Sequence, residues 1–331
     1  MSSQSFPIFD LGAFEAAHLE DKRRLGTEVD RICRSTGFLA IANHGVADAV
    51  IANVWDKTHS FFDLPAETKQ RAKTLYPGYP YGYLGPGTEA LAKSRNVDTP
   101  PDLKESFNGG PLAVPSGMSD PEALGFCYAA TIWPEGPEGF TEAWKAYYSS
   151  MEDLAARIMR VFATALGLDE HFFDTYVDAP ISALRALNYP EQHVPPQPGQ
   201  LRAGAHTDYG SLTILLPQPG SKGLEIIAPD GRWTPVPPVE GAFVINIGDL
   251  MALWTNDRWV STVHRVVNPP PEEGGMQRRQ SLAFFHQPNW FAEIACLPSC
   301  LKPGEAPKYA PVLSGLYLMG KFKSTVTAKA G

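Results

Sequence analysis

Two histidines and one aspartate are the residues in this sequence whose types and spacing most clearly point to chemistry. His206 and Asp208 lie two residues apart in the stretch 204–210, and residues i and i+2 of a β-strand point to the same face. A second imidazole, His264, follows in the stretch 261–267. Two histidines and one carboxylate form the facial triad of non-haem iron(II) sites, which leaves positions open for a cosubstrate and oxygen. These three residues are therefore a candidate metal site.

A candidate carboxylate-binding pair follows the last candidate ligand by 279 − 264 = 15 residues. Arg279 and Ser281 would share one face of a strand. A guanidinium group binds a carboxylate through two parallel hydrogen bonds, and the serine hydroxyl suits the same ligand. The pair therefore predicts a site for a small acid in the same part of the chain as the metal site.

Other interpretations of the same residues remain open at this point. An isolated His-x-Asp pair is most often a loop or surface pair, and His264 could be a hydrogen-bonded core residue. Zinc hydrolases also use histidines with a carboxylate, although no glutamate lies in a helical His-Glu-x-x-His frame and a hydrolase has no evident use for Arg279 and Ser281. A third class is a non-catalytic barrel that binds a small acid, but a pure binder needs no open metal positions.

The order of His-x-Asp, a distal His and Arg-x-Ser resembles the isopenicillin N synthase-like branch of the iron(II)- and 2-oxoglutarate-dependent oxygenases. The resemblance covers nearly the whole chain. Two stretches, 102–106 and 202–211, look most like the thymine 7-hydroxylase type within that branch. The other stretches that are similar to the family are 37–46, 61–69, 246–250 and 261–266.

This resemblance implies a fold and an enzyme class. The fold would be mainly β with flanking helices, built on a double-stranded β-helix, or jelly roll. The resemblance implies that His206, Asp208 and His264 bind iron(II), that 2-oxoglutarate takes two further positions and that oxygen takes the third. The enzyme would be a dioxygenase that decarboxylates 2-oxoglutarate to succinate and CO2 while oxidising, and most simply hydroxylating, a small-molecule substrate.

The resemblance also assigns the cosubstrate residues. Arg279 and Ser281 match the family positions that bind the distal carboxylate of 2-oxoglutarate, and Tyr189 matches a tyrosine that hydrogen-bonds the same group. Plant members often carry a second tyrosine just before it, where this chain has Asn188. Isopenicillin N synthase itself keeps an Arg-x-Ser pair and uses it for its substrate. An iron oxidase that consumes no 2-oxoglutarate is therefore the alternative within the family.

Three further residues are candidates for substrate contacts. Arg185 shares a strand face with Tyr189, and a buried arginine needs a partner, so it would form either an internal salt bridge or a contact with a polar or anionic substrate. Tyr209 follows Asp208 directly, and Phe285 lies on the strand face of the expected carboxylate site. Core packing would explain either aromatic residue equally well. The thymine 7-hydroxylase resemblance suggests a small planar or heterocyclic substrate, whose identity and exact oxidation stay open.

Apolar periodicity predicts a set of helices followed by a series of short strands. Many short strands separated by turns favour a sandwich or a barrel. Residues 76–137 are rich in Pro, Gly and Tyr, and we expect them to be irregular apart from a short element near 104–107. Long irregular stretches are usually functional or mobile. The expected helices are about 19–36, 47–63 and 139–166, with a terminal helix within 302–331, and the expected strands are 182–189, 212–216, 224–227, 243–247, 263–267 and 281–286.

These elements suggest four regions in one compact unit. An N-terminal oxygenase region with an irregular lid would span 1–118, a long packing helix 119–178, the jelly-roll core 179–295 and a C-terminal segment 296–331.

Composition limits the cellular setting. The 331-residue chain is 44% hydrophobic and 19% charged, as expected for a globular enzyme with a large core. A net charge of −8 without a basic run argues against nucleic-acid binding. No apolar run approaches the roughly 20 residues of a membrane span, and the N-terminus lacks the features of a signal peptide. We therefore expect a cytoplasmic protein with four reduced cysteines, a monomer or weak homo-oligomer that binds a small molecule.

Overall fold

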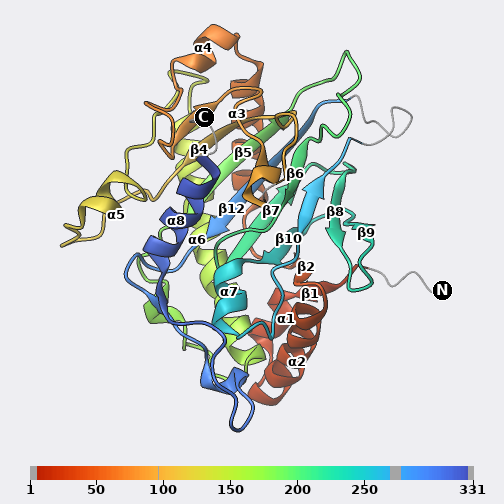
Figure 1. Cartoon of the computed structure of the whole chain (residues 1–331), viewed down its shortest axis with the longest axis vertical. Coiled ribbons are helices and arrows are strands. Elements are labelled where there is room, and N and C mark those ends of the chain that lie inside the picture. Colours follow the sequence, from red (N-terminus) through yellow and green to blue (C-terminus); the bar gives the residue numbers. More distant parts are fainter. Residues whose placement is uncertain (1–5, 96, 269–276, 327–331) are drawn as a thin grey trace.

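Two β-sheets form the centre of the computed structural model, which describes residues 6–95, 97–268 and 277–326 (Figure 1). Apart from the parallel pair β1–β2, the described strand pairs are antiparallel. The major sheet has eight strands in the order β1 (Ile8–Asp10), β2 (Phe38–Ala42), β10 (Phe243–Ile247), β7 (Leu212–Pro217), β12 (Arg279–His286), β5 (Ala183–Tyr189), β4 (Glu105–Gly109) and β3 (Gly82–Leu84). The minor sheet has four strands in the order β6 (Ala203–His206), β11 (His264–Val266), β8 (Leu224–Ile227) and β9 (Trp233–Pro235). The two sheets face each other and helices flank them. The predicted fold, a mainly β jelly roll with flanking helices, is therefore confirmed.

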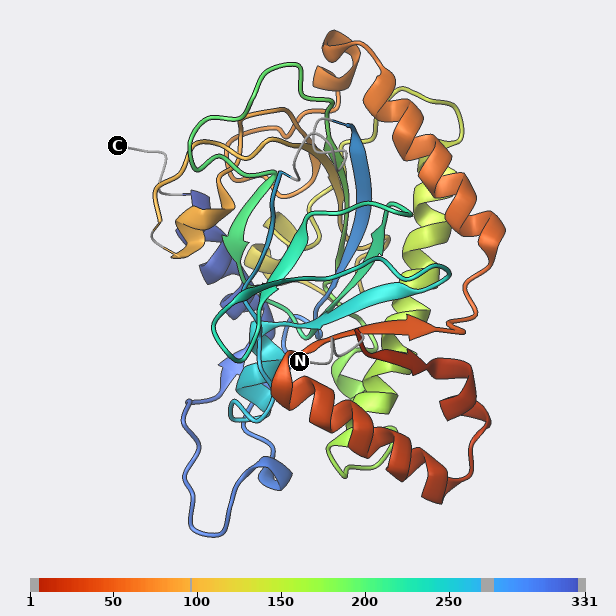
Figure 2. The same cartoon turned by 90° about the vertical axis from the view of Figure 1, so that its right-hand side faces the viewer.

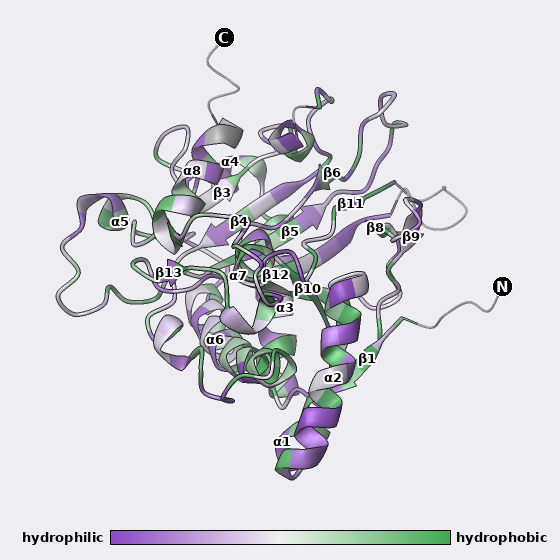
Figure 3. Ribbon diagram, turned by 60° about the horizontal axis from the view of Figure 1, so that its bottom comes forward, coloured by the Kyte–Doolittle hydropathy of each residue, from purple (hydrophilic) through white to green (hydrophobic). Residues whose placement is uncertain are grey.

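Helices cover the outer face of the major sheet, where Figure 2 shows the long α6 running beside α3. The expected helices near 19–36, 47–63 and 139–166 are confirmed as α2 (Leu19–Ser35), α3 (Asp48–Asp63) and α6 (Phe140–Ala165). Each presents an apolar side to the core, and hydrophobic and hydrophilic residues alternate visibly along α2 (Figure 3). Gly37 and Gly167 follow α2 and α6 with φ of 62° and 72°, the left-handed conformation that ends a helix and favours glycine.

The remaining elements are short, apart from the expected terminal helix. They are α1 (Leu11–Ala16), α4 (Ala66–Gln70), α5 (Pro121–Gly125), α7 (Asp249–Trp254), the terminal α8 (Ser314–Val326), the strands β13 (Glu293–Ile294) and β14 (Val312–Leu313), and 3-10 turns at Leu91–Arg95, Asp174–Tyr176 and Pro298–Cys300. Within the described part of the chain, none of the helices is long and apolar enough to cross a membrane.

Alternation along β12 divides its side chains between two environments. Leu282 and Phe284 belong to the large apolar cluster that includes α6, whereas Ala283 and Phe285 belong to a smaller cluster between the two sheets. Because side chains alternate with a period of two, Arg279 points to the inner side, between the sheets. The same alternation puts the odd-numbered residues of β5 on this inner face, since Leu187 and Tyr189 belong to the inner cluster.

The expectation of an irregular segment over 76–137 is only partly right. The short element expected near 104–107 is β4, whose five residues are all buried, whereas β3 and α5 were not expected. Both strands lie at the edge of the major sheet. The strand β9 was not among those predicted, because it has only three residues and no apolar alternation. The strand assumed to carry His206 and Asp208 is β6, but it ends at His206. The region boundaries at 118, 178 and 295 stay predictions.

Candidate metal centre and cosubstrate site

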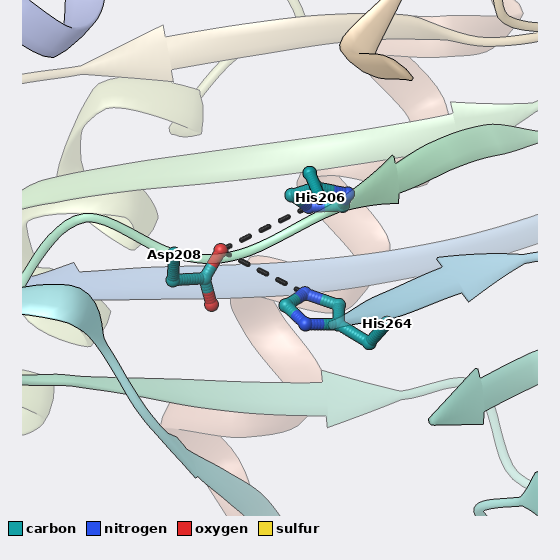
Figure 4. Close-up of side chains that lie close together, drawn as sticks. All are labelled: His206, Asp208 and His264. Carbon is teal, nitrogen blue, oxygen red and sulfur yellow. Dashed lines mark ion pairs between the residues drawn. The ribbon is translucent and has the colours of Figure 1, made fainter. Parts of the chain in front are cut away.

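Three side chains converge between the two sheets, as Figure 4 shows. His206 ends β6 and His264 begins β11, and the two are register partners with ring centres 4.4 Å apart. The Oδ1 atom of Asp208 lies 3.9 Å from Nε2 of His206 and 3.7 Å from Nε2 of His264. One possible ligand atom from each residue lies within 4.8 Å of the others. Two metal–ligand bonds of roughly 2.0–2.2 Å separate their outer atoms by at most about 4.4 Å. Both Asp208 distances fall within that limit, so small side-chain shifts would let the three residues share one ion.

Asp208 differs from its predicted placement. It lies in the turn after β6, not on a strand, so the two-residue strand spacing does not explain how it joins His206. Its backbone carbonyl instead accepts a hydrogen bond of 2.8 Å from the N–H of Asp249, at the start of α7. The chain therefore turns at the metal site, and α7 holds that turn.

Hydrogen bonds orient both imidazoles toward Asp208. The Nδ1 atom of His206 lies 2.7 Å from the carbonyl oxygen of Gly204, and Nδ1 of His264 lies 3.0 Å from that of Thr262. A carbonyl only accepts, so each Nδ1 carries the proton and donates it. The lone pair of each Nε2 is then free for a metal, the arrangement expected for metal-binding histidines.

The carboxylate of Asp208 is held through its other oxygen. Its Oδ2 atom accepts hydrogen bonds of 2.5 Å from the hydroxyl of Thr213 and 2.7 Å from the amide of Asn246. These donors come from β7 and β10, two neighbouring strands of the major sheet. Only Oδ1 is left facing the histidines, so the carboxylate is positioned to bind a metal through one oxygen.

Burial and neighbouring charges set the protonation of the site. Burial, with the nearby His264, lowers the pKa of His206. Burial alone would raise the pKa of Asp208, but the two histidines and the two hydrogen bonds outweigh it and lower that pKa. A neutral imidazole and an ionised carboxylate are the forms that bind a divalent cation, so the site is ready for a metal at neutral pH.

Arg279 forms a second candidate site on the inner face of β12. Its side chain is buried, and its Nε donates a hydrogen bond of 3.2 Å to the Ser221 hydroxyl. Its guanidinium carbon lies 5.0 Å from the ring centre of Tyr189, its register partner on β5. Its Nη1 has no hydrogen-bond partner, and no acidic side chain among the described residues pairs with it. Leaving a buried charged N–H unpaired is costly, so this geometry fits an acidic ligand such as the distal carboxylate of 2-oxoglutarate.

Ser281 and Asn188 end up on opposite sides of the sheet. Ser281 is buried two residues after Arg279 and shares its inner face. Asn188, where plant relatives often have a second tyrosine, points outward and donates a hydrogen bond of 2.7 Å to Glu105. It therefore takes no part in the arginine site.

The three candidate substrate residues lie in different surroundings. Arg185 forms the internal salt bridge that the sequence left open, with Nη2 2.9 Å from Glu89 and Nε 2.6 Å from Asn108. Phe285 packs in the apolar cluster between the sheets. Tyr209 lies under α8, where Nζ of Lys321 is 5.6 Å from its ring centre.

Several polar residues around these sites were missed by sequence reasoning. Thr213 and Asn246 lie 5 and 38 residues from Asp208, and only the strand register brings them to it. Arg202 is buried, with its guanidinium carbon 6.0 Å from the Tyr189 ring. The available signal was a single polar residue within each of the otherwise apolar strands β7 and β10, but it does not reveal which strands pair.

Comparisons with known proteins agree with this geometry. The profile of the 2OG-Fe(II) oxygenase superfamily matches residues 181–288, and the profile described as "non-haem dioxygenase in morphine synthesis N-terminal" matches residues 6–136. The chain is 33% identical to the 2-oxoglutarate-Fe(II) type oxidoreductase hxnY of Emericella nidulans, covering 98% of this chain and 91% of that protein. It is also 33% identical to the homoarginine-6-hydroxylase 2-ODD-233 of Oryza sativa, covering 91% and 89% of the two chains.

Solved structures show the same likeness. The full-length thymine 7-hydroxylase of Neurospora crassa, in complex with alpha-KG, superposes with a TM-score of 0.85 and 30% identity over 98% of both chains. The same protein in complex with alpha-KG and thymine gives a TM-score of 0.84. The chain belongs to the 2OG-Fe(II) oxygenase superfamily, as an iron(II)- and 2-oxoglutarate-dependent dioxygenase of the thymine 7-hydroxylase-like type.

Proposed function

We propose that this dioxygenase hydroxylates a small molecule at an iron(II) ion bound by His206, Asp208 and His264. In the overall reaction, one atom of O2 enters the substrate as a hydroxyl group. The other enters succinate as 2-oxoglutarate loses CO2. Iron, when bound, supplies the activation of oxygen that a C–H bond requires. The three residues would hold the ion, and a site with three protein ligands leaves positions open for cosubstrate and oxygen.

We assign the distal carboxylate of 2-oxoglutarate to Arg279, Ser281 and Tyr189. The observation that carries this proposal is the buried Arg279 guanidinium, whose Nη1 has no partner. A bidentate carboxylate would satisfy it and neutralise its charge. Tyr189 lies against the guanidinium and limits its movement.

Arg185, Tyr209 and Phe285 are proposed to border the substrate. Arg185 and Phe285 are on the inner faces of two neighbouring strands, and Tyr209 follows a metal ligand directly. A guanidinium and two aromatic rings suit a compact, planar, polar molecule. The thymine complex of the Neurospora crassa protein supports such a substrate. We further propose that the protein acts in the cytoplasm as a monomer or weak homo-oligomer.

Succinate formation tests this function. Iron-loaded protein supplied with 2-oxoglutarate and oxygen should release succinate slowly alone, and faster with a substrate. Succinate and consumed oxygen should then be equal in amount. Oxygen consumption without succinate would support the alternative, an iron oxidase that uses Arg279 and Ser281 for its substrate.

A further inference from the structure

We propose that Glu89 is a specificity-determining residue that restricts the enzyme to uncharged substrates carrying an amide-like pair of hydrogen-bond donor and acceptor. The inference rests on the proposed function, because it takes Arg185 as part of the substrate site. The new element is the carboxylate beside that arginine. Glu89 lies in the stretch expected to be irregular, and sequence reasoning gave it no role.

Two arginines point inward from neighbouring strands but differ in their partners. On β12, Arg279 has no acidic partner among the described residues and keeps an unpartnered Nη1. On β5, Arg185 donates a hydrogen bond of 2.9 Å from Nη2 to Oε1 of Glu89, and one of 2.6 Å from Nε to Asn108. An acidic ligand would therefore complete the Arg279 site, whereas Arg185 already has its counter-charge.

The charges around Glu89 balance one another. Its Oε2 atom lies 3.5 Å from Nζ of Lys104, and that ammonium group lies 3.0 Å from Oδ2 of Asp102. With Arg185, these groups are two cations and two carboxylates, so the cluster is neutral. Burial alone would raise the pKa of Glu89, but Arg185 and Lys104 outweigh it and lower that pKa to about 2. Glu89 therefore stays ionised at neutral pH and keeps its place as the counter-charge of Arg185.

A hydrogen bond connects this cluster to the metal site. Oδ1 of Asp102 accepts a hydrogen bond of 3.0 Å from the backbone N–H of Gly204, two residues before His206. The neutral cluster therefore contacts β6, the strand that carries the first metal ligand, and its Arg185 lies on the inner face of β5, between the two sheets.

These observations limit the substrate's charge. A substrate carboxylate would approach Glu89, and a substrate cation would approach Arg185 and Lys104; in either case a like charge would lie in a largely buried setting. An amide or imide adds no net charge. Its N–H can donate to the Glu89 carboxylate while its carbonyl accepts from the Arg185 guanidinium. Neutral molecules should therefore bind at least about tenfold more tightly than charged molecules of the same shape.

Three probes of nearly the same planar shape test this proposal: benzamide, benzoate and benzamidinium. Each is titrated calorimetrically into anaerobic protein saturated with iron(II) and 2-oxoglutarate, so that benzoate cannot occupy the Arg279 site. Wild-type protein should bind benzamide about tenfold more tightly than either charged probe. In Glu89→Gln, the uncompensated cations should improve benzoate binding relative to benzamide by about tenfold or more.

Glu225→Gln provides the matched control. Glu225 also pairs with an arginine, at 2.8 Å from Arg265, but it lies on the outer face of the minor sheet, opposite the inward Leu224 and Ile226. This variant should keep the wild-type order of the three probes. A Glu89→Gln protein with the same order as wild type would overturn the proposal.

The affinities of wild-type protein for the three probes test the proposal even if Glu89→Gln fails to fold. Failure of benzamide to bind, or a charged probe that binds as tightly as benzamide, would also overturn the proposal. The metal-to-ligand absorption band of the iron–2-oxoglutarate complex, recorded on the same samples, distinguishes a failure of the Glu89 proposal from a failure of the proposed function. A normal band with the wrong probe order rejects only the role of Glu89, whereas the absence of the band rejects the proposed function.

Discussion

Asn246 donates a hydrogen bond of 2.7 Å to Oδ2 of Asp208, the carboxylate oxygen that faces away from the two histidines. Thr213 donates to the same oxygen from the neighbouring strand. Because Asp208 lies in a turn, these two side chains and the N–H of Asp249 fix its direction. Side chains of the major sheet therefore position Asp208, which lies in a turn and not on a strand of the minor sheet.

Removing these donors should weaken iron binding without unfolding the protein. Asn246→Ala and Thr213→Val should each lower the iron(II) affinity by roughly 10- to 100-fold, as is common for partners of metal ligands. Competition with a chelator measures this affinity. Thr164→Val is a matched control, since among the described residues that hydroxyl bonds the carbonyl of Arg160, within α6. Equal iron affinity in all three variants would show that Asp208 needs no such support.

Replacing a ligand should have a larger effect. His206→Ala, Asp208→Ala and His264→Ala should each abolish succinate formation, because an incomplete facial triad does not retain the ion in a reactive geometry. Circular dichroism should show the same secondary structure as wild type, since the apolar clusters on both faces of the major sheet are untouched. Full activity in His264→Ala would show that His264 is not a metal ligand.

A buried histidine away from the metal site should make stability depend on pH. His286 lies on the outer face of β12, with Nδ1 2.7 Å from the Ser211 hydroxyl, and burial lowers its pKa to about 3. An unfolded histidine titrates near a pKa of about 6.5. Between these values the unfolded state binds a proton that the folded state does not. The free energy of unfolding should therefore fall as the pH falls below about 6.5, by at most about 1.4 kcal/mol per pH unit for this group.

Urea unfolding of wild type and His286→Gln between pH 7 and pH 4 measures this effect. Glutamine cannot take up a proton in this range but keeps a polar group near Ser211, so the variant should show a shallower decrease in stability toward low pH. The difference in slope should approach one proton. Identical slopes in the two proteins would mean that His286 does not contribute.

The part of the site that could be predicted from the sequence depends on local spacing. Arg279 and Ser281 share a face because they lie on one strand, and the longest apolar patterns predicted α2, α3 and α6. The rest depends on contacts that only the register fixes. Asp208 reaches the histidines through a turn, and its partners come from two other strands. Glu89 lies in a stretch without periodicity, so no pattern relates it to Arg185.

Arg279 is the residue on which the assignment of the 2-oxoglutarate site depends. A charge-assisted bidentate pair in a partly desolvated site contributes roughly 2–4 kcal/mol. Arg279→Gln should therefore weaken 2-oxoglutarate binding by roughly 30- to 1000-fold, since each 1.4 kcal/mol is a factor of ten. Arg279→Lys keeps the charge but loses the planar fork, so its affinity should fall between the two. Iron affinity should barely change in either variant.

The most direct measurement is an anaerobic titration of iron(II)-loaded protein with 2-oxoglutarate, without a primary substrate. It follows the metal-to-ligand absorption band in wild type, Arg279→Lys and Arg279→Gln. We expect saturation in wild type, weaker binding in the lysine variant and a loss of roughly 30- to 1000-fold in the glutamine variant. An unchanged 2-oxoglutarate affinity in Arg279→Gln would contradict the proposed role and assign this arginine to another ligand.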